Sequence, residues 1–63
     1  MKTNLIYREE DGGYVGHIQE YPDFESQGES LVELQDNLLD IYKDIQAGLV
    51  PNATPAKVLE LVI

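Results

Sequence analysis

The chain has 63 residues, with 12 Asp or Glu against four Lys or Arg, so its formal net charge is −8. Such a chain forms at most one small domain. It has no cysteine to form a disulfide or to bind a metal, so we expect its stability to come from dense packing or from oligomerisation. The acidic charge argues against direct binding of nucleic acid and suits a basic protein partner. The absence of cysteine and of a long apolar run predicts a cytoplasmic chain with no membrane contact.

Three short strands are predicted in the first 28 residues. Residues 3–9 are rich in Leu, Ile, Tyr and Thr, and residues 13–20 form the next run of strand-forming residues. The letters EDGG join them, and Asp-Gly is a strong hairpin signal because Gly tolerates positive φ. Pro22 ends the second strand, since it has no N–H to give to a ladder, and residues 24–28 follow as the third strand of a meander.

A helix is predicted over residues 31–47. Ser30 is the expected N-cap, with Glu33 three residues later as in a capping box. Gly48 is the expected C-terminal stop, and Pro51 lies shortly beyond it. The apolar residues recur at helical spacing, at Leu31, Leu34, Leu38, Ile41, Tyr42, Ile45 and Leu49.

The end of the chain is predicted to be a fourth strand. Residues 51–55, PNATP, are a linker, and the remaining letters AKVLELVI are typical of a strand. A strand–helix–strand connection is right-handed, so this strand should run parallel to one of the first three. The expected fold is α+β, with order β-β-β-α-β. Residues 1–63 then form a single domain, a four-stranded sheet with one helix on one face.

Apolar residues exceed what one helix on one sheet face can cover. Val32 and Leu39 fall on the flank of the helix stripe, and Val58 and Val62 alternate with the other apolar residues of the last strand. Exposed apolar groups of this kind mark interfaces, although singly scattered ones are normal. We therefore predict a homo-oligomer, a dimer or larger, with these four residues at the interface.

No catalytic, cofactor or metal site is predicted. Glu9, Glu10 and Asp11 could resemble the acidic centre of a ribonuclease H, but two-metal catalysis needs carboxylates that converge from several elements. Three consecutive acids beside Gly-Gly fit a solvated turn better. His17 is the only histidine and has no nucleophile or second base at a recognisable spacing.

Two sets of residues are candidate partner contacts. Asp36, Asp40 and Asp44 repeat every four residues along one side of the predicted helix, although like charges at this spacing destabilise a helix. A basic partner would explain the stripe, and an ordinary solvated face is the alternative. Tyr21 and Phe24 form the second set, because aromatic residues are enriched at interfaces.

The four tyrosines are expected to differ in burial. Tyr14 and Tyr42 should be mostly packed, whereas Tyr21, beside a proline, should be more exposed.

Residues 9–30, EEDGGYVGHIQEYPDFESQGES, followed by LVELQDNLLDIYKD, resemble the N-terminal domain of HicB-type antitoxins. The shared order is an acidic turn, Gly-Gly-Tyr, a strand ending near a proline, Ser-Gln-Gly, a small hydroxyl residue and a Leu-rich amphipathic helix. The resemblance covers about residues 4–48. It implies a partial ribonuclease-H-like fold without catalytic residues, and self-association.

The resemblance also implies a partner, a small basic HicA-like toxin that cleaves mRNA and whose RNA-binding surface the antitoxin covers. An orphan HicB-like domain that only associates with itself is the alternative. Two departures stand out. The family's Pro-(Glu or Asp)-Leu-Pro-Gly passage is replaced here by residues 19–24, QEYPDF, and full-length members carry a C-terminal DNA-binding domain, so we expect a short form without one.

Overall fold

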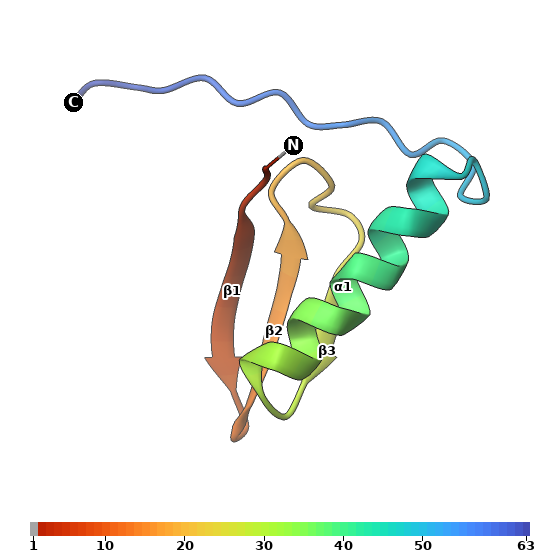
Figure 1. The fold of residues 1–63 in the computed structure, drawn as a ribbon. Coiled ribbons are helices and arrows are strands. Elements are labelled where there is room, and N and C mark those ends of the chain that lie inside the picture. The colour runs from red at the N-terminus through yellow and green to blue at the C-terminus, as the bar shows by residue number, and fades with distance from the viewer. Residues whose placement is uncertain (1) are drawn as a thin grey trace.

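The computed structural model describes residues 2–63 and shows a three-stranded antiparallel sheet with one helix against it (Figure 1). The elements are β1 (Leu5–Glu10), β2 (Gly13–Ile18), β3 (Ser26–Gly28) and α1 (Leu31–Gln46), and the strands lie in the order β1-β2-β3. The predicted α+β class, the meander and the helix are confirmed, with strands somewhat shorter than the sequence pattern indicated.

The β1–β2 hairpin closes on a two-residue turn. Asp11 has φ 51° and Gly12 has φ 80°, while Glu10 and Gly13 face one another as the last pair of the ladder. Two positive φ values at the turn centre match the type I′ geometry, whose twist suits the flanking strands. The predicted hairpin is confirmed, and its acids lie at a solvated turn.

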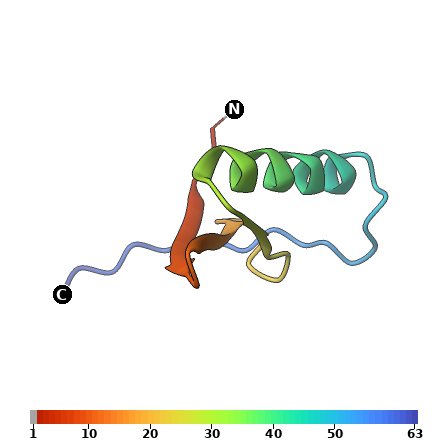
Figure 2. The ribbon, with the colours of Figure 1, turned by 90° about the horizontal axis from the view of Figure 1, so that it is seen from below.

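The two faces of the sheet have different environments. Leu5 pairs with Ile18 and both belong to or pack on the core, so this face, shared with Tyr14, lies under α1 (Figure 2). Because side chains alternate along a strand, the opposite face carries Ile6, Val15 and His17. One face is therefore covered by the helix and the other is open.

The core lies between the sheet and α1. Its buried residues are Ile18, Tyr21, Leu34 and Leu38. Half-buried residues pack around them, namely Leu5, Tyr14, Phe24, Ile41, Tyr42, Ile45 and Ala53. The packing predicted for Tyr14 and Tyr42 is confirmed.

Tyr21 is only 5% exposed, so the expectation that it would be the more exposed tyrosine was wrong. Its N–H donates to the carbonyl of Ile18 at 2.9 Å, which curls the chain back after β2 and turns the ring inward. The ring centroid lies 6.3 Å from that of Phe24 and 6.3 Å from that of Tyr42. A tight turn before Pro22 therefore places an aromatic ring where a continuing strand would have left it outside.

Both ends of α1 are capped as the sequence predicted. The N–H of Glu33 donates to Ser30 Oγ at 3.1 Å. At the other end Gly48 has φ 75°, its N–H donates to the carbonyl of Ile45, and the N–H of Leu49 donates to the carbonyl of Asp44. This pair of bonds is a Schellman motif, which satisfies carbonyls that a helix end leaves without partners.

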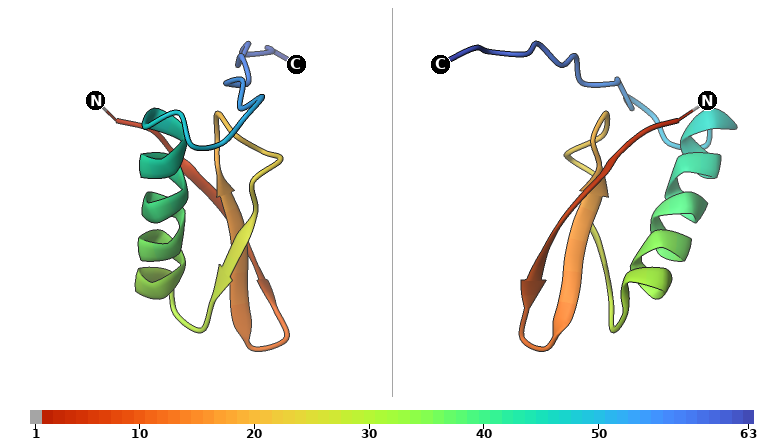
Figure 3. Two further views of the ribbon diagram at one scale, coloured as in Figure 1. Left: turned by 90° about the vertical axis from the view of Figure 1, so that its right-hand side faces the viewer. Right: turned by 60° about the vertical axis from the view of Figure 1, so that its left-hand side comes forward.

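The predicted fourth strand is absent from the described residues, so a four-stranded sheet is not seen in the single chain. The N–H of Ala56 donates to the carbonyl of Glu20, and residues 57–63 then run as an extended tail away from the body (Figures 1 and 3). A strand-like sequence becomes a strand only when a neighbouring edge accepts its hydrogen bonds. This tail passes the end of the sheet without lying along an edge.

Candidate partner-binding surfaces

The first candidate surface is the acidic face of α1, formed by Glu33, Asp36, Asp40 and Asp44. All four side chains are exposed. At 100° per residue they span about 80° of the helix circumference and centre about 140° from the buried Leu34 and Leu38. Within residues 2–63 both ion pairs belong to Arg8, so no carboxylate of this face is neutralised by an ion pair there. The carboxylates of the acidic face are therefore exposed and not held in ion pairs.

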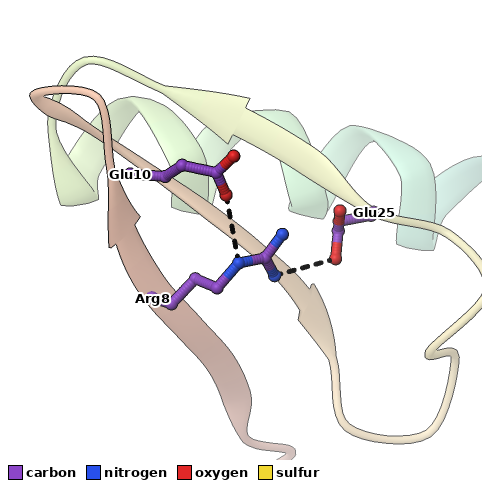
Figure 4. Close-up of polar contacts among 3 residues, drawn as sticks. All are labelled: Arg8, Glu10 and Glu25. Carbon is purple, nitrogen blue, oxygen red and sulfur yellow. Dashed lines mark hydrogen bonds and ion pairs between the residues drawn. The ribbon is translucent and has the colours of Figure 1, made fainter.

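Arg8 pairs with two acids on the open face of the sheet (Figure 4). Its Nε lies 3.1 Å from Glu10 Oε2 and its Nη1 lies 3.2 Å from Glu25 Oε2, joining β1 to the segment before β3. The Glu25 carboxylate, and then Glu10, raises the pKa of the Arg8 guanidinium above its ordinary value. The three side chains are about half exposed, and ion pairs at such positions contribute little to stability.

Sequence reasoning missed this cluster. Residues two apart on a strand share a face, which was the available signal for Arg8 and Glu10. Glu25 could not be paired with them from sequence, because the fold brings it in from across the sheet.

The acids of the hairpin do not converge. Glu10 is engaged by Arg8, whereas Glu9 and Asp11 are exposed. In the part of the chain that the structure describes, no three His, Asp or Glu side chains gather as metal ligands. His17 is half-buried on the open face, opposite Ile6.

The aromatic pair proposed for partner contact is largely internal. Tyr21 is buried in the core, so its assignment as a partner contact is wrong, because its ring already packs between the sheet and α1. Phe24 is half-buried and packs edge-on against Tyr21. The segment after β2 therefore serves the core more than the surface.

The second candidate surface is an apolar groove between β1 and α1, with a volume of about 230 Å³. Its apolar lining is Leu5, Ile18, Leu38, Leu39 and Tyr42. Polar groups come from Gln35 and from residues 2–4, and the lining includes Lys2 but no acid. The groove is thus a neutral to basic region on a strongly acidic molecule.

All four residues predicted for self-association are exposed. Leu39 lies in the groove lining, and Val32, 68% exposed, is on α1 outside the core. Val58 and Val62 lie on the tail, 65% and 91% exposed. The structure therefore places one of the four in the groove, one elsewhere on α1 and two on the tail.

The single helix among residues 2–63 is too short and too polar to cross a membrane.

In comparisons with known proteins, no family model, no curated protein and no solved structure matches this chain.

Proposed function

We propose that this chain is a HicB-like, antitoxin-type binding module that neutralises a small basic mRNA-cleaving toxin by covering its RNA-binding surface. The observation that carries this proposal is the acidic face of α1, whose carboxylates are exposed and free of ion pairs within residues 2–63. A surface that binds RNA is basic, and complementary fields speed association and exclude wrong partners. The proposed role is binding in the cytoplasm, with no catalysis and no cofactor.

The order of elements gives the proposal further support. The turn at Asp11-Gly12, the strand before Pro22, and the Ser-Gln-Gly strand leading into a capped helix fold into one connected unit. We propose that residues 57–63 supply the missing fourth strand of a partial ribonuclease-H-like sheet, beside the free edge of β1. The groove between β1 and α1 supports this placement, because a strand there would fill it.

The test removes three of the four negative charges of the acidic face and keeps its shape. The variant Asp36→Asn, Asp40→Asn, Asp44→Asn should bind the toxin with an association rate lower by about tenfold at low salt and with a weaker salt dependence. The matched control is Glu9→Gln, Asp11→Asn, Asp23→Asn, which removes the same charge from exposed positions away from α1. The probe is the small basic protein that co-purifies with the chain from its native host.

Equal association rates for the two triple variants would show that the acidic face is not the contact. If no basic protein co-purifies, that result would support the alternative function, a self-associating structural or regulatory domain without a toxin. The exposed apolar tail is the observation that favours this second function.

A further inference from the structure

We propose that residues 57–63 of one copy lie beside β1 of a second copy, and that the second copy returns its own tail in the same way. The result is a strand-exchanged dimer in which each sheet is completed by its partner. This inference rests on the fourth strand of the proposed fold and needs no toxin.

The outer edge of β1 has the hydrogen-bonding groups that such a strand requires. The N–H of Gln19 donates to the carbonyl of Asn4 at 2.8 Å, which fixes the alternation along the antiparallel β1–β2 pair. The backbone groups of Leu5, Tyr7 and Glu9 therefore point away from β2, towards the free edge. An edge of this kind pairs with another chain unless something covers it.

Residues 57–63 are long enough to cover this edge, and their side-chain pattern fits it. Seven extended residues span about 23 Å, and the six residues of β1 span about 20 Å. Alternation puts Lys57, Leu59, Leu61 and Ile63 on one side of a strand and Val58, Glu60 and Val62 on the other. We assign the side with Leu59, Leu61 and Ile63 to the groove, where these three residues would meet the apolar lining, which includes Leu5, Leu38 and Leu39.

The path of the chain favours exchange over pairing with its own β1. After the hydrogen bond from Ala56 to Glu20, the tail stays in the layer of the sheet and crosses past one end of the strands. It then extends beyond β1, on the side away from β2 (Figures 1 and 2). To lie along its own β1 it would need a sharp corner just after Ala56. Residues 56–63 contain no Gly, Pro, Asn or Asp, the residues that make tight turns. A straight tail reaches a neighbouring copy more readily.

The single copy exposes more surface than a compact chain of its size. Its accessible surface is 5196 Å², whereas a compact 7.1 kDa monomer would expose about 4100 Å². The five large apolar residues of the tail are each at least 65% exposed. Reciprocal exchange covers two tails and two grooves at once, as a two-fold symmetric interface does.

Charge also favours this contact between copies. Two molecules of net charge −8 repel one another over most of their surfaces. The tail carries one Lys and one Glu, at positions 57 and 60, and the groove lining has Lys2 and no acid. The copies would therefore meet through the part of each surface where acids are fewest.

The test uses the absence of native cysteine. Copies carrying Ile6→Cys and copies carrying Glu60→Cys are mixed, refolded together and treated with a short bifunctional thiol reagent. Exchange predicts a covalent pair containing one copy of each variant. Pairing Glu60→Cys with Asp40→Cys, on the acidic face of α1, is the control that should give no such product.

A double variant, Ile6→Cys with Glu60→Cys on one chain, separates exchange from pairing within a copy. Intramolecular links in the double variant, with none in the mixed single variants, would overturn the proposal. So would sedimentation of the unmodified chain as a monomer at every concentration. Neither result depends on the toxin, so this inference and the proposed function fail separately.

A second variant tests the edge itself. Tyr7→Pro removes an outward-pointing N–H and keeps the β1–β2 ladder, whereas Tyr7→Val removes the ring and keeps the N–H. Relative to Tyr7→Val, Tyr7→Pro should raise the dimer dissociation constant by about tenfold. Equal constants for two folded variants would show that β1 does not accept the strand.

Discussion

Gly28 allows the end of β3 to approach the start of α1 more closely than any other residue type would. A Cβ built at this position would lie 2.6 Å from the backbone nitrogen of Leu34 and 3.1 Å from the Cβ of Glu33. Leu34 is fully buried, so the backbone there cannot move away without disturbing the core. Glycine at position 28 is therefore a packing requirement.

We predict that Gly28→Ala destabilises the fold by about 1–3 kcal/mol, the usual cost of overpacking. Gly12→Asn is the matched control, because nothing lies within 4 Å of a Cβ there and Asn tolerates its positive φ. Urea unfolding at one fixed protein concentration measures both free energies. A Gly28→Ala protein as stable as the control would mean that β3 and α1 can move apart enough to admit a Cβ.

At the residue scale, sequence reasoning succeeded where the cause was local. Asp36, Asp40 and Asp44 were correctly placed on one exposed side of a helix, because helical spacing alone decides that. Tyr21 was misjudged because its burial depends on a turn and on rings brought from other elements. Arg8 was missed because Glu25, its partner, is distant in sequence.

At the scale of elements, α1 shows how start and stop signals set a boundary. The hydroxyl of Ser30 accepts from Glu33 at the first turn, and Gly48 closes the last turn with positive φ. Both helix signals are short-range, and so is the Asp11-Gly12 signal of the hairpin turn. The helix and the hairpin could therefore be predicted from sequence. Residues 57–63 have an equally clear strand pattern, but a strand needs a partner edge that the sequence does not identify.

Ser30→Ala should destabilise the protein by about 1 kcal/mol, because one N–H at the start of α1 loses its acceptor. Ser30→Asp should stay close to the parent protein, since its carboxylate caps the same N–H. Thermal and urea unfolding of the two variants make the comparison. Equal losses for both would assign the effect to packing and not to the cap.

For the whole molecule, charge distribution sets opposite salt responses for its two proposed associations. The copies have equal charge, −8 each, and repel, whereas a basic toxin is attracted to the acidic face of α1. Added salt screens both interactions, with a Debye length of about 10 Å at 0.1 M. Self-association and toxin binding can therefore be told apart by whether added salt strengthens or weakens the association.

We predict that raising NaCl from low to physiological concentration lowers the dissociation constant of the dimer and raises that of the toxin complex. Sedimentation across a salt series measures the first, and binding kinetics at matched salt measure the second. A dimer that weakens with salt would show that its interface relies on attractive ion pairs, contrary to the neutral contact inferred here.

The free tail gives the chain a dependence on its own abundance. A strand that comes from another copy is a bimolecular part of the fold, so its occupancy follows mass action. In dilute solution, edges and tails are open to proteases and to foreign strands, whereas in concentrated solution they protect one another. With the proposed exchange, the resistance of each copy to proteolysis would therefore rise with the concentration of the protein, as the five exposed apolar residues of the tail become covered.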